Sequence, residues 1–338
     1  MITTIQKLLE GASFLEITRE NEDHLASEVF ENTDYLISIR GTGIIKIIPK
    51  KTNSKNSYLI STAIHGNETA PIEIVDAIIS DFFSGNLHFT SPTLIIFGSP
   101  KSMNIAKRFV DFNLNRLFAG AWKDISKCYE TQRAKEIEDV CYEFKNEFCN
   151  LSLCHYDLHT AIKPSKHEKF AIYPFSNKRK EISMPQIAFV QDLGCDAVLF
   201  SKTKSTTFSC FSANELEAES FTVELGKVWP FGQNPMLKFE KAKTVLRDLL
   251  SGNYHEKQGP TKELSLYDVH SSIIKQGEDF KFLYEGEVEN FTTFTKETPL
   301  YFDINNIYKT QESDLALIFP NESVEIGQRA GLLVKKRS

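Results

Sequence analysis

The stretch Leu59-Ile60-Ser61-Thr62-Ala63-Ile64-His65-Gly66-Asn67-Glu68 decides the fold of this 338-residue chain. Its first half is an apolar run typical of a buried strand. The following turn carries an imidazole and a carboxylate three residues apart, and Pro71 then stands in the first turn of an expected helix, where it costs no backbone hydrogen bond. Two potential metal ligands therefore lie at a strand-to-helix junction, where α/β proteins place their binding sites.

The rest of the chain up to residue 252 alternates strands with helices. Strands are expected at 41–50, 58–64, 93–98, 153–158, 170–173, 197–200 and 221–225, and helices at 5–9, 72–83, 131–148, 186–193 and 236–250, with the rest of 1–30 as polar connections. This alternation predicts an α/β sandwich. Beyond Gly259-Pro260 short alternating runs predict a small β-rich module. We therefore expect two domains, over residues 1–252 and 253–338.

Composition and charge argue against several classes of function. A formal net charge of -6 argues against a nucleic-acid-binding surface, so positive charge for an anionic ligand must be concentrated locally. The longest apolar runs are too short to span a bilayer, and the N-terminus does not resemble a signal peptide. None of the six cysteines has a paired CxxC spacing. Reduced thiols and a cytoplasmic location are the expectation.

Three side chains suggest a metal site. His159 follows an apolar strand, and with His65 and Glu68 it would provide three nitrogen and oxygen ligands. Such a set leaves one position open, as in catalytic zinc sites, although cobalt or manganese would also fit. Asp157 could orient His65 or His159 from behind. Taken alone, each histidine is more often structural, and only the combination favours a metal.

Two further features suggest chemistry on an anionic substrate. Glu224 ends an apolar strand, where it either faces solvent or acts as a buried general base. The loop from Arg108 to Arg116 is either an ordinary solvated loop or a carboxylate-binding site, because arginine forms bidentate pairs with planar anions.

Four strings together resemble one enzyme family: His65-Gly66-Asn67-Glu68, Asn115-Arg116, Asp157-Leu158-His159 and Glu224-Leu225-Gly226. They are similar to the succinylglutamate desuccinylase and aspartoacylase family, which has a zinc carboxypeptidase-like α/β/α sandwich around a mixed sheet. The resemblance is strongest over residues 57–120 and 155–235. It is closer to the desuccinylase branch, through the longer strings that begin at His65 and Glu224.

The resemblance implies a role for each matching residue. One Zn²⁺ per subunit would be held by His65, Glu68 and His159. Glu224 would act as general base and then as proton donor to the leaving amine. Arg108 would polarise the scissile carbonyl, while Asn115 and Arg116 would grip a substrate carboxylate. Residues 206–214 match only loosely, so no role is assigned there.

The implied reaction is hydrolysis of N-succinyl-L-glutamate to succinate and L-glutamate, a step of arginine catabolism by the arginine succinyltransferase pathway. An aspartoacylase-like enzyme acting on N-acyl-aspartate remains open as an alternative. A peptidase of the wider fold and a non-catalytic carboxylate-binding protein are further alternatives. The sequence leaves the oligomeric state open.

Overall fold

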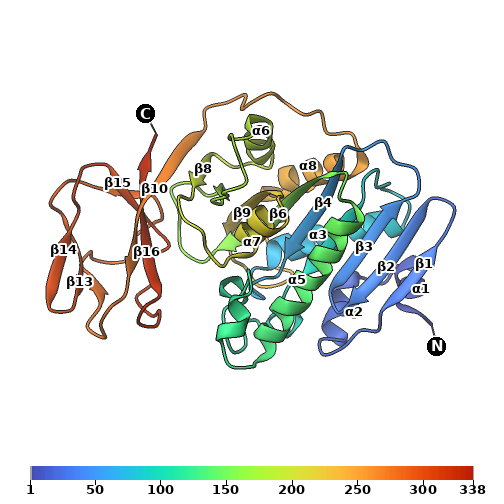
Figure 1. The fold of residues 1–338 in the computed structure, drawn as a ribbon, viewed down its shortest axis with the longest axis horizontal. Coiled ribbons are helices and arrows are strands. Elements are labelled where there is room, and N and C mark those ends of the chain that lie inside the picture. Colours follow the sequence, from blue (N-terminus) through green and yellow to red (C-terminus); the bar gives the residue numbers. More distant parts are fainter. Residues whose placement is uncertain (1, 338) are drawn as a thin grey trace.

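A long mixed sheet runs through the computed structural model, which describes residues 2–337 (Figure 1). Its thirteen strands in this described range are β1 (Glu28–Glu31), β2 (Tyr35–Gly41), β3 (Ile44–Pro49), β4 (Asn56–Thr62), β5 (Thr93–Phe97), β6 (Ser152–Ala161), β7 (Phe170–Tyr173), β8 (Ala197–Phe200), β9 (Glu219–Lys227), β10 (Ser265–Ile274), β12 (Thr292–Phe294), β15 (Leu315–Ile318) and β16 (Arg329–Lys336). They lie in the order β1-β2-β3-β5-β4-β6-β9-β7-β8-β10-β16-β15-β12.

The centre of the sheet is parallel. β4 pairs in parallel with both β5 and β6, and β6 pairs in parallel with β9. The carboxyl ends of β4, β6 and β9 therefore meet at one edge of the sheet. That edge is where the sequence places the candidate ligands.

Helices cover both faces of this central sheet. One apolar cluster joins Ile60 of β4 to helices α1 (Thr4–Leu9), α2 (Phe14–Glu20), α3 (Thr69–Phe83), α6 (Met184–Asp192) and α8 (Glu240–Ser251). The other joins Leu59 to α5 (Tyr129–Glu147) and α7 (Phe208–Glu215). Successive side chains of a strand point to opposite faces, so β4 is buried on both faces. The predicted α/β/α sandwich around a mixed sheet is confirmed.

The remaining helical turns are short. They are α4 (Pro100–Asn104), η1 (Leu114–Arg116), η2 (Ala121–Asp124) and η3 (Met236–Lys238). None of the helices in residues 2–337 is both long enough and apolar enough to cross a membrane.

The C-terminal β-rich module is also confirmed, but it is joined to the central sheet. β10 pairs in parallel with β8 and antiparallel with β16, so the sheet continues into the module. A separate three-stranded sheet contains β11 (Lys281–Phe282), β13 (Pro299–Asp303) and β14 (Asn306–Lys309), at the left of Figure 1. Phe170 and Leu199 share an apolar cluster with Phe291 and Leu332 of the module. The boundary between residues 252 and 253 remains a prediction.

Several elements differ from the sequence-based expectation. Residues 14–20 form a helix where polar connections were predicted, because Ser13 caps it and Phe14 and Ile17 are buried. β1 and most of β2 were also missed, and so was the short helix that begins at Pro100. Residues 208–215, which had no assigned role, form helix α7 beside β9 and β6.

Candidate active site

The turn between β4 and α3 is tightly constrained. Ala63 adopts a left-handed backbone conformation (φ 55°), and Glu68 occupies the N-cap position of α3. A Cβ atom on Gly66 would lie 2.2 Å from the backbone carbon of Ser102, so only glycine fits there. These constraints turn His65 and Glu68 toward the carboxyl end of β6.

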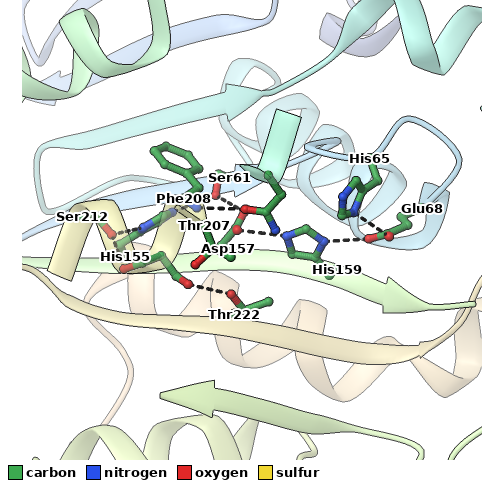
Figure 2. A network of polar contacts seen from close by, with 12 residues as sticks. Ser61, His65, Glu68, His155, Asp157, His159, Thr207, Phe208, Ser212 and Thr222 are labelled. Atoms are coloured by element: carbon green, nitrogen blue, oxygen red, sulfur yellow. Dashed lines mark hydrogen bonds and ion pairs between the residues drawn. The ribbon is translucent and has the colours of Figure 1, made fainter. Parts of the chain in front are cut away.

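Figure 2 shows that His65, Glu68 and His159 converge. Nδ1 of His65 lies 2.8 Å from Oε1 of Glu68, and Nδ1 of His159 lies 2.8 Å from Oε2 of the same carboxylate. One ligand atom from each residue lies within 4.8 Å of the others, and all three side chains are buried. The structure therefore brings together the three residues that the sequence suggested as ligands.

The hydrogen bonds around His65 place the ring hydrogen on Nε2, which leaves Nδ1 with a free lone pair. Oδ1 of Asn113 accepts from the backbone N–H of Asn115 and lies 3.0 Å from Nε2 of His65, so Nε2 is the nitrogen that donates. Burial and then the charge of Arg108 lower the pKa of His65 to about 4, which keeps the ring neutral. Nδ1 is buried without a hydrogen-bond partner, facing a carboxylate that also only accepts.

His159 has a matching arrangement. Its Nε2 lies 2.9 Å from Oδ2 of Asp157, which fixes that nitrogen as a donor and turns Nδ1 toward Glu68. Burial opposes a charge on this ring, but the carboxylates of Asp157 and Glu68 outweigh burial and raise its pKa well above the usual value. This position favours a positive charge. A metal ion bound by two imidazole nitrogens and one carboxylate supplies that charge, so the residues fit Zn²⁺.

The sequence suggested that Asp157 orients either His65 or His159. The structure places it against His159. His65 is instead oriented by Asn113. Asn113 lies in the loop from Arg108 to Arg116, but no sequence feature assigned it a role. An asparagine in a turn rich in asparagine carries no separate sequence signal, and the contact emerges only when the loop folds over the strand end.

Glu224 lies on the strand next to His159. The two residues are paired in the register of β6 and β9, and Glu224 is 8% exposed. Burial, followed by the nearby charge of Glu68, raises the pKa of its carboxyl group to about 7. Its Oε2 is buried without a hydrogen-bond partner among the described residues. The carboxyl group is therefore able both to take up and to release a proton near neutral pH, and it does not simply face solvent.

The loop from Arg108 to Arg116 lies beside the candidate metal ligands. The carboxylate of Glu130 accepts hydrogen bonds from the backbone N–H groups of Val110, Asp111 and Phe112. Arg108 donates from Nη1 to Oε1 of Glu68 at 2.6 Å. The predicted carbonyl-polarising arginine thus stands directly beside the proposed metal site.

Asn115 and Arg116 occupy the end of this loop in η1. Oδ1 of Asn115 accepts from the backbone N–H of Phe208 at the start of α7. The side-chain N–H groups of Asn115 are therefore the ones that could donate to an anion. Burial, followed by the charges of Arg329 and Arg108, lowers the pKa of Arg116 to about 9. No carboxylate of residues 2–337 forms an ion pair with Arg116 or Arg329.

Arg329 is a second residue that the sequence did not assign to the site. It begins β16 in the C-terminal module, and its pKa is lowered by burial. In the sequence, the string Arg329-Ala330-Gly331-Leu332-Leu333 resembles the same family only weakly, and this was the available signal. Three arginines from two parts of the chain therefore form a positively charged cluster beside the histidines.

Family models match both parts of the chain. Residues 54–250 match the model described as the succinylglutamate desuccinylase/aspartoacylase catalytic domain, and residues 262–337 match the AstE/AspA barrel-sandwich hybrid domain. The chain belongs to the succinylglutamate desuccinylase/aspartoacylase family.

Relatives extend this family match over the whole length. A protein of Pseudoalteromonas atlantica named succinylglutamate desuccinylase is 40% identical, over 98% of this chain and 96% of its own length. Solved structures described as succinylglutamate desuccinylases have the same fold. The Vibrio parahaemolyticus structure is 31% identical with a TM-score of 0.87, covering 96% of this chain and 95% of its own. The Chromobacterium violaceum structure is 32% identical with a TM-score of 0.83, covering 96% and 98%.

Proposed function

We propose that this chain is a zinc-dependent amidohydrolase that cleaves N-succinyl-L-glutamate to succinate and L-glutamate. The observation that carries the proposal is the buried His65-Glu68-His159 set, together with a nearby carboxyl group of raised pKa and an arginine cluster in which Arg116 and Arg329 have no acidic partner among the described residues. The names of the full-length relatives support the choice of substrate. A role in arginine catabolism remains a prediction from the family resemblance. A cytoplasmic location remains a prediction from the cysteine spacing.

In this proposal His65, Glu68 and His159 hold one Zn²⁺. The ion, when bound, supplies a Lewis acid that polarises the scissile carbonyl and makes water a better nucleophile at neutral pH. Arg108 adds a fixed positive charge beside that carbonyl, where negative charge builds up as the amide is attacked. Its hydrogen bond to Glu68 already holds it in place.

Glu224 moves the proton. Its carboxylate takes a proton from the attacking water and then donates it to the leaving amine nitrogen, which becomes the amino group of glutamate. A base with a pKa near 7 suits both halves of this transfer. Burial in β9 both supplies the raised pKa and excludes bulk water from the carboxyl group.

Arg116, Arg329 and Asn115 bind the carboxylates of the substrate. N-succinyl-L-glutamate carries three carboxylates, and two arginines without acidic partners are suited to accept two of them in bidentate pairs. An acidic chain would otherwise repel such a substrate. Binding relieves the repulsion between the two guanidinium groups.

The test compares hydrolysis of N-succinyl-L-glutamate and N-acetyl-L-aspartate, each with a chelator and with zinc restored. We expect turnover that the chelator abolishes, that zinc restores and that favours succinylglutamate. A preference for the aspartate compound would keep the mechanism and replace the substrate. Zinc binding without turnover of either compound would favour a non-catalytic carboxylate-binding protein.

A further inference from the structure

A row of fully buried polar side chains lies behind His159, on the side away from the ligand cluster (Figure 2). It runs from Ser220 on β9 through Ser212 on α7 to His155 on β6, and then through Ser61 on β4 to Asp157. Every member has an exposed fraction of 0%. The proposed reaction uses none of the first four.

The distances show one continuous chain of hydrogen bonds. Oγ of Ser212 lies 2.8 Å from Oγ of Ser220 and 2.6 Å from Nδ1 of His155. Oγ of Ser61 lies 2.8 Å from Nε2 of His155 and 2.6 Å from Oδ1 of Asp157. The row therefore connects three neighbouring strands and one helix to the carboxylate that holds His159.

Only one direction of donation satisfies the Ser61 end of the row. The carboxylate of Asp157 accepts on both oxygens, from His159 on one and from Ser61 on the other. A serine hydroxyl has a single hydrogen, so Ser61 donates it to Asp157 and must accept from His155. The hydrogen of the His155 ring is thereby placed on Nε2.

The other end follows from the charge of His155. Burial lowers its pKa to about 4, so the ring is neutral and carries one hydrogen. With that hydrogen on Nε2, Nδ1 is an acceptor. The hydroxyl of Ser212 has two acceptors within reach, Nδ1 of His155 at 2.6 Å and the backbone carbonyl of Ser209 at 3.1 Å. The shorter contact favours donation to Nδ1, which has no other donor among the described residues. The hydroxyl of Ser212 then accepts from Ser220. Ser220 also has a second acceptor, the carbonyl of Ala218 at 3.4 Å, but its contact with Ser212 is shorter at 2.8 Å. The arrangement with the shortest contacts therefore points every hydrogen of the row toward Asp157.

We propose that His155 is a positioning residue that, through Ser61 and Asp157, keeps the hydrogen of His159 on Nε2 and presents its Nδ1 to the metal. This rests on the proposed role of His159 as a ligand. Removing His155 leaves the hydroxyl of Ser61 without a donor and free to turn away from Asp157. Groups that orient a metal-bound histidine from behind typically affect metal affinity by about 10- to 100-fold.

The main experiment compares two substitutions at His155 by zinc affinity, measured in competition with a chromogenic chelator. In His155→Gln, the amide oxygen accepts from Ser212 and the amide N–H donates to Ser61, so the direction of the row is kept. In His155→Leu, both functions are lost at similar volume. We expect His155→Leu to bind zinc about 10- to 100-fold more weakly and His155→Gln to remain within a few-fold of the parent chain.

Ser209→Ala is the matched control. Ser209 is a buried serine on the same helix as Ser212, but its hydroxyl pairs with Thr222 and lies outside the row. Its zinc affinity should equal that of the parent chain. If His155→Leu fails to fold, Ser61→Ala tests the same link, with an expected loss of about tenfold.

A spectroscopic measurement tests the direction itself. ¹⁵N NMR of the zinc-loaded protein should show His155 as the neutral tautomer protonated on Nε2 between pH 6 and 8. Protonation on Nδ1 would overturn the proposal. Equal losses in the Gln and Leu variants would also overturn it, since they would reveal a packing role. Failure of the parent chain to bind zinc would instead overturn the proposed function, and the inference with it.

Discussion

Glu224 is the residue that separates catalysis from metal binding. Glu224→Gln keeps the shape of the side chain but removes its ability to take up a proton. We expect zinc affinity to stay within a few-fold of the parent chain and kcat to fall by at least about 100-fold. Steady-state kinetics and zinc titration of the same preparation measure both. A variant with near-normal kcat would show that another group is the base.

Arg116 and Arg329 should contribute mainly to substrate affinity. Carboxylate binding is largely common to the ground state and the transition state, so its loss raises KM more than it lowers kcat. We expect KM for N-succinyl-L-glutamate to rise at least about tenfold in Arg116→Gln and in Arg329→Gln. Arg40→Gln, at a surface ion pair with Glu143, is the control. A loss confined to kcat would place the substituted arginine among the catalytic groups.

His155 should make the protein sensitive to acid. Its folded pKa is about 4 against an ordinary value of 6.5, so between these values the unfolded chain binds more protons. The free energy of unfolding therefore falls as pH falls through this window, by about 2 kcal/mol from pH 7 to pH 5. Urea unfolding at the two pH values should show a shallower decline in His155→Gln. Equal declines would contradict the assignment.

Among the individual site residues, the sequence predicted those that belong to short local motifs. His65 and Glu68 follow β4, while His159 and Glu224 lie near the carboxyl ends of β6 and β9. Adjacent parallel strands bring such ends together. Asn113 and Arg329 were missed because their positions depend on how a loop and a distant domain fold. The pairing of an asparagine with one particular ring nitrogen leaves no trace in the local sequence.

At the scale of elements, the turn between β4 and α3 is the most sensitive connection. Gly66→Ala places a Cβ atom 2.2 Å from the backbone carbon of Ser102 and 2.3 Å from the nitrogen of Met103. Backbone atoms cannot rotate away, so the turn or α4 must move, at a cost of about 1–3 kcal/mol. We expect lower urea stability and at least about tenfold weaker zinc binding.

Gly259→Ala is the control for this substitution, because its nearest neighbour is Cβ of Met184 at 4.0 Å. It should leave both stability and zinc affinity unchanged. A Gly66→Ala variant that behaves in the same way would show that the turn tolerates a side chain.

The elements that were predicted are the long or strongly apolar ones. β4 and β5 bury nearly every residue, and α3 buries apolar residues at helical spacing. Both patterns are visible in the sequence alone. Among the short helices α1 was predicted, whereas α2 and α7 were not. The seven residues of α2 and the eight of α7 span about two turns each, so a helical period gives only a weak signal there. Their helical state depends on capping and on packing against the sheet.

For the whole molecule, the shared sheet makes the two parts interdependent. A chain ending at residue 252 would lose β10 and expose the paired edge of β8, together with Phe170 and Leu199 of the shared cluster. Exposed apolar strand edges promote aggregation. We expect residues 1–252 alone to aggregate or to unfold at much lower urea concentration than the full chain. A well-folded monomeric fragment would support two independently stable domains.

The sequence indicated a β-rich tail but could not indicate this continuity. Strand pairing between β8 and β10 joins residues far apart in the chain, and a four-residue apolar strand such as Ala197–Phe200 carries no mark of which neighbour it will have. The choice is made by the packing of the module against the sheet.

The pairing of β8 with β10 also has a consequence for synthesis on the ribosome. The chain emerges from its N-terminus, so β4, β6, β9, β7 and β8 are released before β10 and long before β16. At about 5–20 residues per second, completion of the module after β8 takes on the order of ten seconds. During that interval each nascent chain presents an apolar edge without its partner. We therefore expect the yield of folded protein to depend on how rapidly the last third of the chain is made, with slow translation of that region more harmful than slow translation of the first half.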